Sequence, residues 1–234
     1  MEIVSFSALA DFWACPRLYH YRQEQHLPVP QHHTAARREG SWIHQQLDLH
    51  AKGHLPPIAT DPAYAGIWQS YLDVISPYAD AGWSCFSEWS CHVPLRLDAE
   101  QIWLHGRMDR IYVQNQTLVL LDFKTGRDQP GLLSELQLDF YAWLLWQVQD
   151  LLSEQTIGLI EARAVWLAQP GQVMERRLDA AAVPEHGAGF MALLEALLGA
   201  GNRDVPAPRS VAGQPWCTMC EYQRLCPEGS FYAQ

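Results

Sequence analysis

The sequence contains no long hydrophobic run. Its most apolar stretches, over residues 141–148 and 190–198, are far shorter than the roughly 20 residues that a membrane-spanning helix needs. The chain also starts, at Met-Glu-Ile-Val, without the basic segment of a signal peptide. We therefore expect a cytoplasmic protein that does not span a membrane.

Positive charge is scarce as well. The 234 residues include 16 Lys and Arg against 26 Asp and Glu, a formal net charge of −10 at pH 7. Proteins that hold nucleic acid mainly by charge are usually basic, so this balance argues against non-specific coating of duplexes. Any contact with nucleic acid would depend on a local site with bound cations. The apolar fraction of 48% excludes disorder and predicts a substantial core.

Two further absences limit the organisation and the function. The sequence has no G-x-x-x-x-G-K-[ST] motif, so it carries no helicase motif, and any unwinding of a substrate would come from a partner. It also has no internal repeat and no low-complexity run. One large domain, or one domain with an appendage, is the organisation that this length favours.

Hydrophobic periodicity predicts a succession of helices and strands. Helical spacing covers residues 5–25, 35–51, 63–78, 132–152 and 187–198, with a break at Cys15-Pro16. Strand patterns cover residues 85–95, 102–113, 117–124, 156–168 and 172–178, the last two as a hairpin around Pro170-Gly171. A tether rich in Gly, Pro and Ser is expected over residues 201–215. This order favours an α/β or α+β fold with a central mixed sheet flanked by helices.

A short polar turn separates the second and third of these strands. A two-residue turn at 115–116 suits the sequence, because the asparagine at 115 tolerates a positive φ. Counting outward from that turn places Asp109 opposite Asp122, with their Cβ atoms about 5 Å apart. Lys124, two residues beyond Asp122, then lies on the same face of the sheet.

Two carboxylates and one ammonium group on one sheet face require compensation. A divalent cation such as Mg²⁺ would remove the repulsion between the carboxylates. Lys124 could then orient a water molecule or stabilise negative charge on a phosphoryl group. The alternative is a surface salt bridge at a sheet edge, which contributes little. The apolar run over residues 118–121 predicts a buried strand, and charges at the end of such a strand favour a functional site.

The helices before and after this hairpin carry further candidates. His44, in the pattern Gly40-x-x-x-His44, could complete a metal site beside two carboxylates, or it could be a partly buried structural histidine. Gln137 and Tyr141 are four residues apart and share a helix face. They suit a phosphate, a base edge or a supporting contact, and the alternative is an ordinary helix surface.

Taken in order, four segments resemble the PD-(D/E)XK nuclease superfamily and its RecB-type branch. The segments are Gly40-x-x-x-His44, Gly106-Arg107-Met108-Asp109-Arg110-Ile111, Asp122-Phe123-Lys124-Thr125-Gly126 and Gln137-x-x-x-Tyr141. The resemblance implies a restriction-endonuclease-like α/β core over residues 35–200 within a single domain spanning 1–234. It also implies hydrolysis of DNA phosphodiesters with Mg²⁺ or Mn²⁺, at DNA ends or on single strands.

The resemblance also assigns roles to individual residues. It implies that His44, Asp109 and Asp122 are metal ligands, together with the backbone carbonyl of Phe123, and that Asp109, Asp122 and Lys124 are catalytic. Gln137 and Tyr141 would support the site or contact DNA, and Glu88 could be an extra acid. Met108 stands where the family name places a proline, which takes no part in the chemistry. A local cationic rim is expected from Arg37, Arg38, Arg107, Arg110 and Arg127.

Four of the six cysteines form a pattern of their own. Cys15 lies near the start of the chain, and Cys217, Cys220 and Cys226 lie near its end. Four thiolates can hold Zn²⁺ or a [4Fe–4S] cluster. The spacing resembles the iron–sulfur staple of AddB-type nuclease domains and CRISPR-associated Fe–S exonucleases, which implies a cluster joining segments 1–27 and 201–234. The remaining two, at positions 85 and 91, are interpreted as small strand-packing residues.

The leading hypothesis is therefore a metal-dependent DNA exonuclease with an iron–sulfur staple. A helicase or recombination partner would fit this activity, in DNA repair, recombination or CRISPR spacer acquisition. One alternative is a non-catalytic DNA-binding or scaffold module that retains the fold. Another is a zinc-stapled interaction protein.

Overall fold

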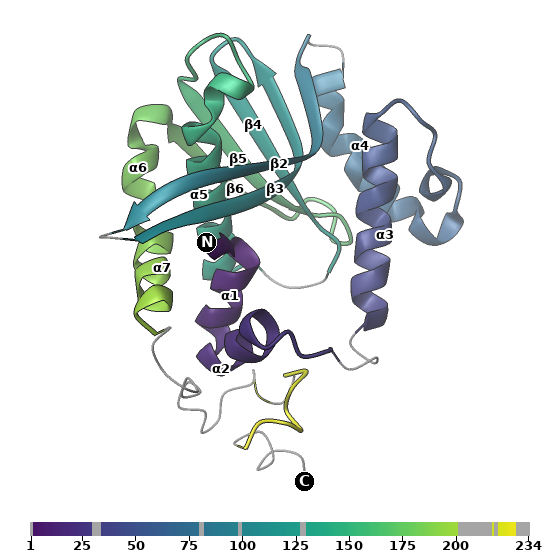
Figure 1. Ribbon diagram of the computed structural model, residues 1–234. Coiled ribbons are helices and arrows are strands. Elements are labelled where there is room, and N and C mark those ends of the chain that lie inside the picture. Colours follow the sequence, from purple (N-terminus) through teal and green to yellow (C-terminus); the bar gives the residue numbers. More distant parts are fainter. Residues whose placement is uncertain are drawn as a thin grey trace. The chain divides into compact units, whose positions relative to one another are not determined.

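The computed structural model describes most of the chain (Figure 1). The described residues are 2–29, 34–79, 82–97, 100–126, 130–200, 217 and 220–227. The predicted tether over 201–215 and the rim residue Arg127 lie outside them. Within the described parts, no helix is long and apolar enough to cross a membrane.

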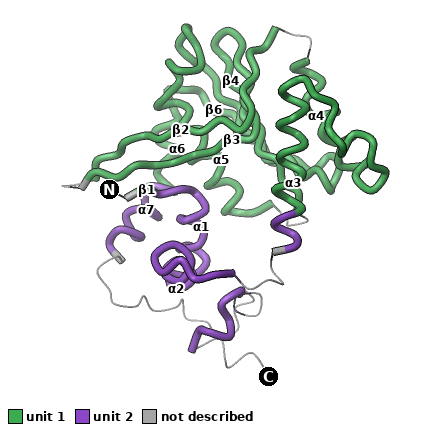
Figure 2. The backbone as a smooth tube through the Cα atoms, turned by 45° about the vertical axis from the view of Figure 1, so that its right-hand side comes forward, with its two compact units in different colours: residues 1–3, 39–189 green, residues 4–38, 190–234 purple. Residues whose placement is uncertain are grey.

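The chain divides into two compact units (Figure 2). One unit comprises residues 1–3 and 39–189, and the other comprises residues 4–38 and 190–234. The sequence-based division, with a core over 35–200 and staple segments at 1–27 and 201–234, stays a prediction.

The described residues form seven α-helices and six strands. The helices are α1 (Phe6–Ala14), α2 (Pro16–Tyr19), α3 (Thr34–Ala51), α4 (Ala65–Ala79), α5 (Leu132–Gln147), α6 (Val183–His186) and α7 (Ala188–Ala200). The strands are β1 (Glu2–Ser5), β2 (Ser84–Leu97), β3 (Glu100–Gln114), β4 (Thr117–Lys124), β5 (Leu159–Trp166) and β6 (Val173–Asp179). A π-helical turn covers His20–Glu24, and short 3₁₀ turns cover Pro57–Ala59, Pro62–Tyr64, Gln149–Leu151 and Ala180–Ala182.

The strands form one mixed sheet in the order β1-β3-β4-β5-β6, with β2 paired to β3. The pairs β2–β3, β3–β4 and β5–β6 are antiparallel, and β4–β5 is parallel. A parallel pair needs a crossover connection, and α5 provides it between β4 and β5. The predicted α/β class, with a mixed sheet flanked by helices, is confirmed.

The predicted hairpin between β3 and β4 is also confirmed. Gln114 pairs with Thr117, and Asn115 has a φ of +52° in the turn between them. The last pair of the ladder is Arg110 with Leu121, so the next position along the two strands brings Asp109 opposite Asp122. The sequence fixes this register because a two-residue turn allows only one alignment of the two strands.

Alternate residues of β4 face different helices. Val119, Leu121 and Phe123 belong to the hydrophobic core that α3 and α4 form against the sheet. Asp122 and Lys124, on the other face, contact Gln137 of α5. Residues 118–121 are at most 1% exposed, which confirms the predicted buried strand. A central strand covered on both faces therefore ends in two charged side chains.

Several predicted boundaries differ from the structure. The helix expected over 5–25 is divided into α1, α2 and the π-helical turn, with the break at Cys15-Pro16 as predicted. The helix expected over 132–152 ends at Gln147, and a 3₁₀ turn follows. No periodicity predicted β1 or α6, because each has only four residues. Cys91 is buried as predicted, but Cys85 is exposed, so the packing interpretation is wrong for Cys85.

Candidate active site

Three potential metal ligands meet in the middle of β3, just beyond the last pair of the β3–β4 ladder. His44 Nδ1, on α3, lies 3.1 Å from Asp109 Oδ1 and 3.9 Å from Glu88 Oε1. Ligand atoms of the three residues all lie within 4.8 Å of one another, and each side chain is half-buried. An imidazole and two carboxylates at this spacing could hold one divalent cation.

Glu88 reaches this group through an unusual backbone conformation. It stands opposite Asp109, between the ladder pairs Ser87–Arg110 and Trp89–Met108, and its φ is +47°. A non-glycine residue in the left-handed region is strained, and such strain often accompanies functional sites. Sequence reasoning named Glu88 only as an extra acid on its strand, since nothing in the local sequence indicates this conformation.

A backbone contact fixes Asp109. The amide of Phe123 donates to Asp109 Oδ2 at 2.7 Å, while Asp109 Oδ1 faces His44. The two oxygens of one carboxylate thus join β4 to α3. The carbonyl of Phe123, expected as a metal ligand, keeps that role as a prediction.

A second set of contacts surrounds Asp122, which is only 7% exposed. Lys124 Nζ lies 2.7 Å from Asp122 Oδ2 and also donates to Gln137 Oε1. Gln137 Nε2 donates to Asp122 Oδ1 at 3.4 Å and to Tyr141 Oη at 3.3 Å. The two α5 residues predicted to share a face therefore contact each other, and Gln137 also contacts both charged residues of β4.

The carboxylates in this cluster repel one another unless a cation is present. Burial raises the pKa of Asp122 and the charge of Asp109 raises it further, while Lys124 lowers it. Burial and then Asp109 raise the pKa of Glu88 as well. Burial alone would lower the pKa of His44, but Asp109, Glu88 and Asp122 together raise it. For all three groups the contribution of the neighbouring carboxylates is the one expected from an excess of negative charge, which a bound cation would relieve.

Two glycines allow close packing around the cluster. A Cβ atom on Gly40 would lie 3.0 Å from Thr125 Oγ1, so α3 approaches the end of β4 closely at this position. A Cβ atom on Gly106 would lie 2.5 Å from a methyl group of Leu144 on α5. Both glycines belong to the segments that the sequence analysis singled out, and the contacts explain why a larger residue would disturb the helices there.

Nearly the whole chain matches one protein family. The sequence model of the PD-(D/E)XK nuclease superfamily matches residues 3–227. The chain belongs to this superfamily. The predicted superfamily is therefore confirmed, while the RecB-type branch and the iron–sulfur staple stay predictions.

The nuclease chain is also similar to solved structures at low identity. The crystal structure of SSO0001 is 17% identical with a TM-score of 0.46, and the match covers 97% of this chain and 87% of that one. An alkaline exonuclease (LHK-Exo) from Laribacter hongkongensis is 12% identical with a TM-score of 0.32, covering 84% of this chain and 88% of that one. At these scores neither likeness supports a functional conclusion. No curated protein matches the chain.

The arginines near the nuclease motifs differ in exposure. Arg107 is exposed, and its Nε lies 3.2 Å from Glu88 Oε2. Arg110 is only 2% exposed and donates to the backbone carbonyl of Leu47 and to the hydroxyls of Tyr71 and Tyr112. The predicted cationic rim is therefore wrong for Arg110. Its burial could not be read from the sequence, because its acceptor on α3 lies 63 positions earlier.

The four cysteines of the predicted staple gather within the unit of residues 4–38 and 190–234. Burial raises the pKa of the Cys220 thiol, and nearby Cys15, Cys217 and Cys226 raise it further. All six cysteines of the chain are among the described residues, and none forms a disulfide. Cys15 and Cys220, which are 205 positions apart in the sequence, are thus close enough for their thiols to interact.

Polar contacts in the same unit bind the C-terminal segment to the N-terminal one. The buried Glu221 accepts from Arg22 Nε at 2.8 Å and from Arg37 Nη2 at 2.9 Å. Arg22 also pairs with Asp11, and Tyr222 Oη donates to the carbonyl of Leu27 at 2.8 Å. These contacts join Glu221 and Tyr222, the two residues after Cys220, to the N-terminal segment of the same unit.

Proposed function

We propose that this protein is a divalent-metal-dependent deoxyribonuclease that hydrolyses phosphodiester bonds, acting at DNA ends or on single strands. The observation that carries the proposal is the register of β3 and β4, which brings Asp109 opposite Asp122 with Lys124 on the same face, in a member of a nuclease superfamily. The preference for ends or single strands comes from the resemblance to RecB-type nucleases.

The side chains at the site fit a Mg²⁺ or Mn²⁺ ion. His44, Glu88 and Asp109 would supply ligand atoms, and Asp122 would supply a further carboxylate from the facing strand. The carbonyl of Phe123 is the additional ligand that the family implies. When bound, the ion would supply the positive charge that makes a water molecule more acidic and neutralises the phosphodiester oxygens.

Lys124 is proposed to orient the attacking water or to stabilise the negative charge that develops on the phosphate. Its ammonium group is held between Asp122 and Gln137, so it has one defined position beside the carboxylates. A preorganised charge of this kind costs no rearrangement during the reaction. Gln137, supported by Tyr141, is proposed to keep the lysine in place. Burial and then Asp122 raise the pKa of Tyr141, which therefore stays a neutral hydroxyl.

Digestion of single-stranded, linear duplex and circular DNA with Mg²⁺ or Mn²⁺ tests the proposal. We expect Asp122→Ala and Lys124→Ala each to lower the cleavage rate at least about a hundredfold. The chain has two lysines, so Lys52→Ala, in the exposed turn that follows α3, is the matched control and should retain full activity. Full activity in either test variant would overturn the mechanism. A wild-type protein that binds DNA but cleaves nothing with any divalent ion would instead be a non-catalytic scaffold.

We also propose that Cys15, Cys217, Cys220 and Cys226 hold a [4Fe–4S] cluster. The support is their proximity in the structure, together with the resemblance to iron–sulfur nucleases. The cluster would supply a cross-link between the two ends of the chain. Anaerobic purification followed by iron, sulfide and zinc analysis tests this, with about four iron atoms per chain expected. Zinc in place of iron would favour a zinc staple, and Cys220→Ser should lose either metal.

Because the chain carries no helicase motif, unwinding of a duplex would require a partner. We propose a helicase or recombination protein in that role, in DNA repair, recombination or CRISPR spacer acquisition. Faster digestion of duplex DNA when a helicase is added, with no change on single strands, would support it.

A further inference from the structure

The outer half of the β2–β3 hairpin presents one continuous exposed face. Beyond the last pair with β4, β2 and β3 continue together over residues 88–97 and 100–109 (Figure 1). Cross-strand partners share a face of the sheet. The partners on the outward face are Ser90 with Arg107, His92 with His105, Pro94 with Trp103 and Arg96 with Gln101. Residues between them, such as Cys91, Ile102 and Leu104, are buried, which settles which face is exposed.

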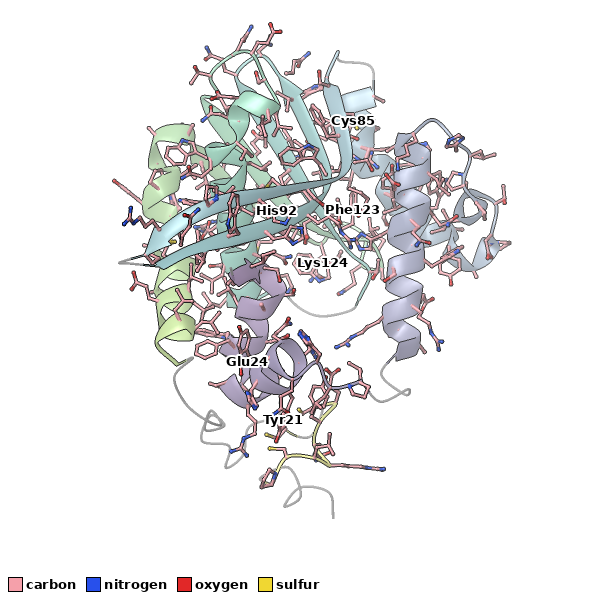
Figure 3. The ribbon with its side chains drawn as sticks, in the orientation of Figure 1. Tyr21, Glu24, Cys85, His92, Phe123 and Lys124 are labelled. Atoms are coloured by element: carbon pink, nitrogen blue, oxygen red, sulfur yellow. The ribbon has the colours of Figure 1, made fainter. Side chains whose placement is uncertain are left out.

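This face is cationic and aromatic, although the chain as a whole has a net charge of −10. Its eight residues include two arginines, two histidines and one tryptophan, and none is acidic. The rings of His92 and His105 are stacked, with centroids 4.6 Å apart (Figure 3 labels His92). Burial, together with the charges of His92 and Arg107, lowers the pKa of His105. Its ring is therefore a neutral, flat surface at neutral pH.

The face is continuous with the candidate active site. Arg107 Nε lies 3.2 Å from Glu88 Oε2, and Glu88 is one of the three clustered potential ligands. From Asp109, the stacked histidines are four residues away and Trp103 is six residues away along β3, or about 13 and 20 Å at 3.3 Å per residue. A strand cut beside Asp109 could thus lie along these residues.

We propose that this face binds single-stranded DNA leading to or from the candidate active site, an inference that rests on the proposed nuclease function. Arg96 and Arg107 would contact phosphates, and Trp103 with the histidine pair would stack on bases. Proteins that bind single strands combine positive charge along the backbone with aromatic platforms in this way. A duplex keeps its bases stacked inside the helix, so the aromatic residues favour a single strand.

Binding can be measured without cleavage. In an Asp122→Ala background, with Ca²⁺ present, fluorescence anisotropy reports the Kd of a labelled single-stranded oligonucleotide. We expect His92→Ala and Arg96→Ala each to raise this Kd about tenfold. We also expect Arg96→Ala to lower the slope of log Kd against log salt by about one unit. The control is Arg177→Ala, because Arg177 is an exposed arginine like Arg96 but lies on β6.

These outcomes separate the two proposals. If the test variants weaken binding and the control does not, while wild-type protein cleaves nothing, the binding face stands and the nuclease function fails. If wild-type protein cleaves DNA but His92→Ala and Arg96→Ala bind as tightly as the control, the binding face is wrong. Equal loss of duplex and single-strand affinity would also overturn it.

Photo-crosslinking provides a second measurement that does not depend on a variant that folds. Wild-type protein with an iodouridine-substituted single strand should give crosslinked peptides containing Trp103, His92 or His105. Crosslinks confined to other parts of the chain would overturn the proposal.

Discussion

Arg110 Nη2 donates to the backbone carbonyl of Leu47 at 3.0 Å, and so joins β3 to α3. Arg110 follows Asp109 directly, and Leu47 lies one helical turn after His44. The buried guanidinium therefore connects the two elements that carry the closest pair of potential ligands. Nη2 also donates to Tyr71 and Nη1 donates to Tyr112, and the guanidinium carbon lies 5.7 and 6.0 Å from the centroids of these two rings.

Replacing Arg110 should destabilise the protein. Arg110→Met would leave a buried carbonyl and two buried hydroxyls without this donor, at a cost of about 3 kcal/mol. Urea unfolding should show a lower midpoint with an unchanged slope. The exposed substitution Arg177→Met is the control, and an equal effect of the two substitutions would contradict the assigned role.

The strained backbone that places Glu88 in the ligand cluster should lower the stability of the metal-free protein. Glu88→Gly would relieve the positive φ and stabilise the metal-free protein by about 1 kcal/mol, measured by urea unfolding in EDTA. The same change removes a carboxylate, so the Kd for Mn²⁺ should rise at least about tenfold by calorimetric titration. Glu88→Gln keeps the strain and should weaken Mn²⁺ binding without the gain in stability. Unchanged Mn²⁺ affinity in both variants would exclude Glu88 from the site.

The contact between Gly40 and Thr125 should be visible in a double-mutant cycle. The Cβ atom added by Gly40→Val would lie 3.0 Å from Thr125 Oγ1. The larger side chain would therefore displace α3 and His44 from β4. We expect the cleavage rate to fall about tenfold, and Thr125→Ala to recover part of the loss while changing the wild type little. Purely additive rate effects of the two substitutions would show that this close approach does not position α3.

His50 should make stability depend on pH. Its Nδ1 lies 3.0 Å from Tyr71 Oη, and burial, followed by the charge of Arg110, lowers its pKa. The unfolded chain therefore holds the proton more tightly. The neutral His50 therefore contributes its full stabilisation above about pH 6.5, the ordinary pKa of histidine. This stabilisation is lost as the pH falls through the lower pKa of the folded state.

This pH effect can be isolated by comparison with a second histidine. His50→Gln should show a smaller loss of unfolding free energy than the wild type between pH 7 and pH 5. His54→Gln changes an exposed histidine four residues away and is the control. Identical pH profiles for the wild type and His50→Gln would contradict the prediction.

The parts of the site that the sequence predicted are those set by local rules. Turn chemistry at Asn115 and the two-residue period of strands were enough to pair Asp109 with Asp122. The helical period likewise placed Gln137 next to Tyr141. The positive φ of Glu88 and the burial of Arg110 depend on β2 and α3, whose packing no local pattern encodes. The exposure of Cys85 also could not be predicted from the sequence, because only its neighbours in space decide whether it is buried.

The shared carboxylate of Glu221 has a consequence for how the protein matures on the ribosome. Domains generally fold as their residues emerge, from the N-terminus onward. The helices α1 and α2 emerge early, but the carboxylate that accepts from Arg22 and Arg37 is made 184 residues after Arg37. The unit of residues 4–38 and 190–234, which contains the first helices, is therefore completed only after residues 39–189 have been synthesised.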